Sequence, residues 1–174
     1  MEQKNNKKIQ NLMREIKIDS VTLHCSTADP QKLERSFKLL KVITGKTPVK
    51  TITRKRIPTF KIRPGLEIGC KVTLRKEKAI EVLTAILMGI PKLNKKQFCP
   101  GSFAFGIKEY IEIPSIPYQR DVGMLGFEVM VALKRKGFRI ARRKLKTRNI
   151  GIKHKISKDE TIEFFKQNFK TPVE

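Results

Sequence analysis

The side chains that could perform covalent or metal chemistry in this sequence are few and poorly placed for it. Cys25, Cys70 and Cys99 are an odd number and form no Cys-x-x-Cys pair, which argues against a disulfide framework and a zinc finger. We interpret all three as small buried hydrophobic residues. His24 and Cys25 are adjacent, so on a strand they point to opposite faces and cannot share a metal ion. We therefore expect no metal site and no cofactor.

Acid–base catalysis has equally little support. His154 lies among lysines, and no carboxylate occurs between Lys134 and Lys158 to orient its ring. The sixteen acidic residues are scattered along the chain rather than clustered. A nuclease or another RNA-processing enzyme would need a carboxylate cluster or a paired acid and base. We therefore expect no catalytic residues and no small-molecule substrate.

Ionic binding of phosphate is the chemistry that the sequence favours. Thirty-nine Lys and Arg against sixteen Asp and Glu give 39 − 16 = +23 over 174 residues. One acid-free stretch, Arg35 to Leu66, holds ten basic residues, and a second, Lys134 to Lys158, holds twelve. A solvated surface is the alternative for such lysines, but without acidic neighbours they repel one another unless a polyanion is present. A polyphosphate offsets that repulsion and releases counterions, so the expected partner is nucleic acid.

The second stretch favours RNA over DNA. Arg139, Arg142, Arg143 and Lys146 lie three or four residues apart and line one face if residues 138–145 are helical. Arginine binds phosphate with two hydrogen bonds and stacks on exposed bases. The sequence contains no heptad zipper, no zinc-finger spacing and no clear helix-turn-helix. Structured RNA is therefore the better match.

The length and composition predict one folded domain with short extensions. A hydrophobic share of 39% is ordinary for a globular protein, and 174 residues correspond to one domain. We divide the chain into a basic N-terminal arm (1–15), a single α+β RNA-binding domain (16–170) and a tail (171–174). No apolar run reaches the roughly 18 residues of a membrane span, and the polar N-terminus is unlike a signal peptide. We expect a soluble intracellular protein.

Hydrophobic periodicity predicts the strands that position these residues. We predict strands at residues 16–25, 49–53, 66–74, 103–113 and 125–133. The first has a phase slip at Asp19-Ser20, which is typical of a β-bulge. Between the second and third lies a basic loop, where Pro58 and Pro64 oppose regular structure.

Capping signals and apolar stripes predict three helices. Asp29 and Pro30 start the first, which Gly45 closes. Ser157 and Glu160 form a capping box at the last. The core-facing residues are Leu33, Phe37 and Leu40 in the first helix, Ala79, Ile80, Leu83, Ile86 and Leu87 in the second, and Ile162, Phe165 and Phe169 in the third. Together these elements predict an α+β fold, a mainly antiparallel sheet with helices packed on one face.

Such a layer leaves the other face of the sheet available for a partner. Ala104 and Gly106 lack side chains that would hold a backbone away from that face. Tyr110 would project from it and could stack on a base. Solvent alone is the alternative occupant.

Several separate motifs, in order, resemble one known family. They are Thr44-Gly45-Lys46-Thr47-Pro48-Val49, Phe60-Lys61-Ile62-Arg63, Ile68 to Arg75, Gly101 to Glu109, Gly137 to Ala141, Ile150-Gly151, Lys153-His154 and Ile156-Ser157-Lys158. They resemble the large-subunit ribosomal protein numbered five in bacteria and eleven in eukaryotes, in its archaeal and eukaryotic branch. The resemblance runs from about Met13 to Phe169.

The resemblance implies a structural constituent of the large ribosomal subunit, without catalytic activity. Its implied partners are 5S rRNA and large-subunit rRNA at the central protuberance, peptidyl-site tRNA, and neighbouring ribosomal proteins that include a small-subunit protein across the subunit interface. It implies no membrane contact. The implied location is cytoplasmic, within the large subunit, and nucleolar during assembly if the source is eukaryotic.

Together with the charge pattern, the resemblance suggests which residues would contact which RNA. The loop of residues 53–64 would contact tRNA through Arg54, Lys55, Arg56, Phe60, Lys61 and Arg63. The expected rRNA-binding residues are Lys7, Lys8, Arg14, Lys17, Lys71, Arg75, Arg139, Arg142, Arg143, Lys144, Lys146, Arg148, Lys153 and His154.

One segment departs from the family pattern. The family follows its first strand with an asparagine and a glycine-rich turn ending in glutamate, near the 5S contact, whereas residues 24–29 here contain no glycine. We therefore carry over the general contact region and not the residues of that motif. A free-standing RNA chaperone or assembly factor would have the same charge and fold. The ordered set of motifs favours the ribosomal protein.

Overall fold

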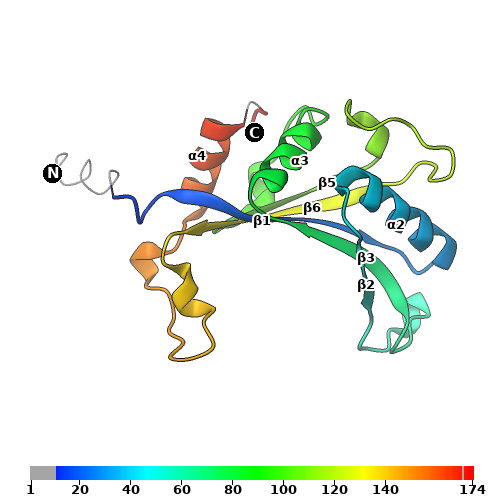
Figure 1. The fold of residues 1–174 in the computed structure, drawn as a ribbon, viewed down its shortest axis with the longest axis horizontal. Helices are drawn as coiled ribbons and strands as arrows, with labels where there is room; N and C mark the ends of the chain where they lie inside the picture. Colours follow the sequence, from blue (N-terminus) through cyan, green and yellow to red (C-terminus); the bar gives the residue numbers. More distant parts are fainter. Residues whose placement is uncertain (1–10, 170) are drawn as a thin grey trace.

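A computed structural model describes residues 11–169 and 171–174, and it shows helices packed on one side of an antiparallel sheet (Figure 1). The strands are β1 (Ile16–Ser26), β2 (Val49–Ile52), β3 (Glu67–Leu74), β4 (Phe98–Cys99), β5 (Ser102–Ile107) and β6 (Phe127–Arg135). They form one six-stranded sheet in the order β2-β3-β1-β6-β5-β4, in which every neighbouring pair is antiparallel. The predicted α+β fold class is confirmed.

β1 runs through the middle of the sheet, between β3 and β6. Its register with β6 shifts between Ile18 and Ser20, which confirms the predicted bulge. From Val21 to Cys25 every second residue is buried against the helices. The bulge leaves Asp19 buried, with 6% of its surface exposed. A buried carboxylate needs cationic partners, and both come from the basic segment that begins at the end of β6.

The helices of the described chain are α2 (Pro30–Thr44), α3 (Glu77–Leu87) and α4 (Lys158–Asn168), and all lie on the same side of the sheet (Figure 1). The predicted caps are confirmed. The Asp29 carboxylate accepts from the Gln31 N–H at 3.0 Å, and Gly45 ends α2 with a left-handed φ of 64°. Ser157 and Glu160 form both bonds of the capping box.

The core lies between the sheet and these helices. Leu23 and Leu74 of the sheet are fully buried, as are Leu40 of α2 and Leu83 of α3. At the α4 end an aromatic cluster fills the core. Its rings are Phe98, Phe103 and Phe165, with centroids 5.3–5.4 Å apart. The buried residues face the helices, and no layer formed by residues 11–169 and 171–174 covers the opposite face of the sheet (Figure 1).

Three predictions about the elements are wrong. Ile80 lies on the outer side of α3 and is 49% exposed, outside the core stripe. The predicted strand 103–113 ends at Ile107, and residues Tyr110–Glu112 form a 3-10 turn instead. That turn swings Tyr110 into the core, where it is fully buried and its hydroxyl accepts from the Gln119 N–H at 2.9 Å. Tyr110 therefore cannot stack on a base.

Candidate nucleic-acid interface

Two basic segments project from opposite ends of the sheet, on the side away from the helices (Figure 1). We call residues 53–64, between β2 and β3, the basic loop, and residues 136–157, between β6 and α4, the basic lobe. The basic loop carries five Lys or Arg and no acid. The lobe lies within the acid-free stretch Lys134 to Lys158, which holds twelve Lys or Arg. The uncovered sheet surface between them is the open face. The three surfaces form a cradle.

The open face has a floor of small and uncharged side chains. The strand register places Thr22 of β1 beside Thr73 of β3 and Met130 of β6, and Met130 beside Ala104 of β5. The Thr22 and Thr73 hydroxyls are 3.4 Å apart. Gly106 lies on the same face, and a Cβ added there would meet no atom within 4 Å. An incoming backbone could approach this floor closely.

A charged row crosses one end of the open face. His24 of β1 lies opposite Lys71 of β3 on one side and Glu128 of β6 on the other. Its Nδ1 atom is 3.7 Å from the Glu128 carboxylate, beyond hydrogen-bonding distance. Cys25 points to the helices, so the prediction that the two neighbours face opposite ways is confirmed. Lys71 is exposed, and Arg75 is exposed just beyond the end of β3.

The basic loop is tied at its base and carries its cations outward. The Thr53 N–H donates to the Leu66 carbonyl at 3.0 Å, and the Lys50–Glu67 ion pair at 2.6 Å flanks that bond. Pro58 and Pro64 were expected to oppose regular structure in this loop, but part of the loop is regular. Pro58–Phe60 form a 3-10 turn, closed by a bridge between Ile57 and Ile62. A turn that begins at proline suits the fixed φ of that residue.

The side chains assigned to tRNA contact all lie on this loop. Phe60 is 66% exposed. Within the described residues, no ion pair joins the loop's five cations to an acid: Arg54, Lys55, Arg56, Lys61 and Arg63. The base of the loop, held by these bonds, thus presents to solvent an aromatic ring and positive charge that no acid of the described chain neutralises.

Residues 138–145 of the basic lobe do not form an α-helix, so the condition under which their cations would line one face is not met. Phe138–Ala141 form a 3-10 turn that Arg142 follows, and Ile152–His154 form a second 3-10 turn. The four cations therefore do not line one helical face. Arg142 pairs with Asp19, and the Arg143 Nε donates to the Lys146 carbonyl at 2.8 Å. These side chains bond to β1 and to the lobe's own backbone, and both contacts stabilise the non-helical course of the chain.

Buried ionic contacts fasten the lobe to the domain. Arg135 is 3% exposed, and its guanidinium donates to the Glu160 carboxylate at 2.6 Å and to the His154 and Lys155 carbonyls. His154 is bonded to the Lys136 carbonyl at 2.9 Å and meets the Phe138 ring edge-on. The expected repulsion within the acid-free stretch is thus partly relieved by acids from elsewhere in the chain. Lys144, Arg148 and Lys153 remain exposed on the lobe.

Of the N-terminal candidates, Lys7 and Lys8 lie outside the described residues. Arg14 is 3.7 Å from Glu160, and Lys17 is 3.2 Å from Glu15, so both lie near the start of β1, beside the root of the lobe. Sequence reasoning missed the open-face threonines and the role of Asp19. The phase slip at Asp19 was the available signal, because a carboxylate placed at a bulge in a basic protein needs cationic partners.

The cysteines do not form a reactive centre. Cys25 and Cys70 are buried, face each other across β1 and β3, and are free thiols. Contact with the Cys70 thiol, together with burial, raises the pKa of the Cys25 thiol, so it stays protonated and a poor nucleophile. Cys99 is exposed, so its predicted burial is wrong. Among residues 11–169 and 171–174 no cluster of potential metal ligands occurs, and no helix there is long and apolar enough to cross a membrane.

Comparison with known proteins agrees with this architecture. The model of the family "Ribosomal protein L5" matches residues 11–63, and a separate model for the C-terminus of the same ribosomal family matches residues 67–164. The two matches meet at the end of the basic loop. Together they cover most of the chain.

Individual relatives match over nearly their whole length, and the three named here come from archaea. The large ribosomal subunit protein uL5 of Nanoarchaeum equitans is 41% identical over 155 residues, 87% of this chain and 92% of that protein. The uL5 protein of Methanobrevibacter smithii is 39% identical over 162 residues, 91% and 95% of the two chains. That of Sulfurisphaera tokodaii is 37% identical over 167 residues, 94% of each. The chain therefore belongs to the ribosomal L5 family, the uL5 proteins of the large ribosomal subunit.

Proposed function

We propose that the open face and the basic lobe of this ribosomal protein bind 5S rRNA and help to place it in the central protuberance of the large subunit, while the basic loop on the same side contacts a second RNA. As a member of the L5 family the protein is a structural component of the ribosome and not an enzyme. One observation carries the proposal. Both basic segments project on the same side of the sheet, and an open face of small side chains lies between them (Figure 1).

The chemistry of the open face suits RNA. Thr22 and Thr73 offer hydroxyls that can bond to ribose 2′-hydroxyls, while Ala104 and Gly106 leave room for the sugar-phosphate chain. Phosphates at the edges of the bound RNA would meet the cations of the lobe and Lys71. The connection from β1 to α2 lies at one end of this face. It lacks the family's glycine-rich turn, so residues 24–29 would reach RNA through a different backbone shape.

The basic loop and the basic lobe would serve different RNAs. The loop is a compact projection tied to the sheet edge β2–β3. It carries exposed Phe60 and arginines that form no ion pair with an acid of the described chain, and we assign peptidyl-site tRNA to it. The lobe is larger and is bonded to the domain through Arg135 and Arg142, as suits a fixed rRNA contact. Large-subunit rRNA and a small-subunit protein across the subunit interface complete the proposed partners.

A direct binding comparison tests the 5S assignment. Filter binding should show tighter binding to 5S rRNA than to an unrelated structured RNA of the same length, at the same salt concentration. Equal affinity for both RNAs would refute specific recognition. Retention on large subunits through a high-salt wash separates a resident protein from a free chaperone, because a chaperone held by charge alone should be released.

Removing charge from the basic loop tests the assignment of tRNA to the loop and of rRNA to the lobe. Alanine at Arg54, Lys55 and Arg56 should leave 5S binding largely intact, because these cations lie on the loop and not on the lobe. The same protein, assembled into large subunits, should bind peptidyl-site tRNA more weakly than the unaltered protein. Loss of 5S binding instead would show that the loop belongs to the 5S contact.

A further inference from the structure

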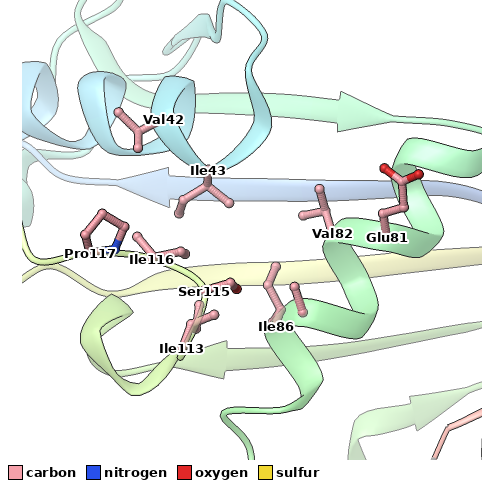
Figure 2. A pocket seen from close by; sticks show the side chains of 10 residues that line it. Val42, Ile43, Glu81, Val82, Ile86, Ile113, Ser115, Ile116 and Pro117 are labelled. Carbon is pink, nitrogen blue, oxygen red and sulfur yellow. The ribbon is translucent and has the colours of Figure 1, made fainter.

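A groove runs across α3 on the side of the molecule that faces away from the cradle. Its first part, of about 350 Å³, lies between Val42 and Ile43 of α2, Val82 and Ile86 of α3, and the segment 113–117 (Figure 2). Its second part, of about 640 Å³, passes over the outer side of α3 and is lined by Ile80, Thr84, Met88 and Pro114. Glu81, Ala85 and Ser115 line both parts, so the two form one continuous α3 groove.

The α3 groove is apolar and open to solvent. Val42 is 47% exposed, Ile80 49% and Met88 73%. Ile80, Thr84 and Met88 follow one another at intervals of four residues along the outer side of the helix. A contiguous apolar surface of this kind on a soluble protein marks a place where another molecule packs.

The charged side chain that lines the α3 groove is acidic, which disfavours RNA as its occupant: Glu81 lines both parts, and no Lys or Arg of the described chain lines either. Outside this lining, α2 carries four bases and one acid, whereas α3 and the segment 109–117 carry four acids and one base. The acids are Glu77, Glu81, Glu109 and Glu112, and all four are exposed. Phosphate would be repelled here, whereas a cationic group would be attracted. A second copy of this chain is disfavoured too, because a symmetric contact through the groove would bring the same carboxylates together.

We propose that the α3 groove docks a segment of another protein in which apolar side chains are accompanied by lysine or arginine. The apolar side chains would enter the space between α2 and α3, and a cation would meet the Glu81 carboxylate, which lines both parts of the groove. This contact would be independent of the RNA contacts on the opposite side. It gives the protein two functional sides, one for RNA and one for protein.

Photo-crosslinking in assembled large subunits tests the proposal. The full-length chain is made with p-benzoylphenylalanine at Ala85, assembled into subunits and irradiated, and the crosslinked product is identified by mass spectrometry. We expect a protein segment that carries apolar and basic residues. A crosslink to rRNA, to a second copy of this chain or to a segment without basic residues would overturn the proposal. So would a yield no higher than that obtained with the probe at Gln167, on the exposed side of α4.

Charge reversal supplies the matched control. Glu81→Lys in the probe-bearing protein should lower the crosslink yield about two- to fivefold, the usual range for one exposed ion pair. Glu163→Lys, which makes the same change on α4, should leave the yield unaltered. Equal yields in the two variants would contradict the role given to Glu81. If the probe at Ala85 prevents assembly, Ile80, already half exposed, carries it instead.

Discussion

Asp19 organises a large part of the positive charge that surrounds it. It is buried at the bulge of β1, and its two carboxylate oxygens accept from Lys134 and Arg142. Burial acts to raise the pKa of this carboxyl, but the hydrogen bonds from the two cations outweigh burial and hold its pKa below the ordinary value. Asp19 therefore stays ionised and ties the basic lobe to the central strand.

Replacing Asp19 by asparagine should lower the free energy of unfolding at pH 7 by about 1–3 kcal/mol, because charged hydrogen bonds are lost. A depressed folded pKa stabilises the protein above the unfolded pKa, and that stabilisation disappears as the pH falls through the folded pKa. The difference between the two proteins should therefore shrink below about pH 4. Urea unfolding between pH 7 and pH 2 measures it.

Glu15→Gln is the control for this substitution. Glu15 pairs with Lys17 and Lys136 at the surface, so its replacement should change the free energy of unfolding far less than Asp19→Asn. A loss of stability in Asp19→Asn that is the same at pH 7 and at pH 2 would show that the carboxylate charge is not responsible.

At the scale of the elements, β5 keeps the open face accessible because Gly106 has no side chain there. Gly106 has no Cβ, and a Cβ placed there meets no atom of the described chain within 4 Å. Gly106→Leu should therefore fold normally but project bulk into the cradle. We expect its affinity for 5S rRNA to fall at least about tenfold, equivalent to about 1.4 kcal/mol. Binding titrations, with circular dichroism to verify folding, provide the measurement.

Gln167→Leu is the matched control for the open face. It adds the same side chain to the exposed side of α4, in the helical layer, and should leave the affinity for 5S rRNA unchanged. Unaltered affinity in Gly106→Leu would mean that the RNA does not approach the sheet at β5.

Features of the elements that depend on neighbouring residues could be predicted from the sequence, whereas those that depend on distant contacts could not. The bulge at Asp19, the cap at Asp29 and the capping box at Ser157 were predicted correctly, because each depends on residues close together in the chain. The spacing of cations in residues 138–145 would suit one face of a helix, but no α-helix forms there, and Arg142 bonds to Asp19, 123 residues earlier in the chain. The spacing of residues within the segment carries no information about a partner so distant in the chain. Tyr110 was misplaced for a similar reason, since its hydroxyl pairs across a turn with Gln119.

The candidate site was predictable in composition but not in arrangement. Charge alone identified the basic loop and the lobe, because long acid-free stretches are visible in the sequence. The strand order β2-β3-β1-β6 separates the roots of the two segments, and both segments project on the side of the sheet away from the helices (Figure 1). Strand order is set by long-range pairing, and a single sequence does not reveal it.

At the scale of the whole molecule, charge is divided between two sides. The basic segments lie on the cradle side, whereas α3 and the segment 109–117 carry more acids than bases. Affinity for 5S rRNA should therefore depend steeply on salt. It should fall by roughly 10³–10⁵ between about 50 and 200 mM if some six to ten phosphates are contacted. A salt titration gives the slope, and a shallow slope would mean that few phosphates are bound.

The cradle itself is tested most directly by two variants that remove equal charge from different places. One replaces Lys144, Arg148 and Lys153 of the lobe by alanine, and the other replaces Arg54, Lys55 and Arg56 of the loop. Affinity for 5S rRNA is measured for both at the same salt concentration. We expect the lobe variant to bind much more weakly and the loop variant to bind nearly as well as the unaltered protein. Equal losses would show that net charge alone governs binding and would contradict the assignment of 5S rRNA to the lobe and the open face.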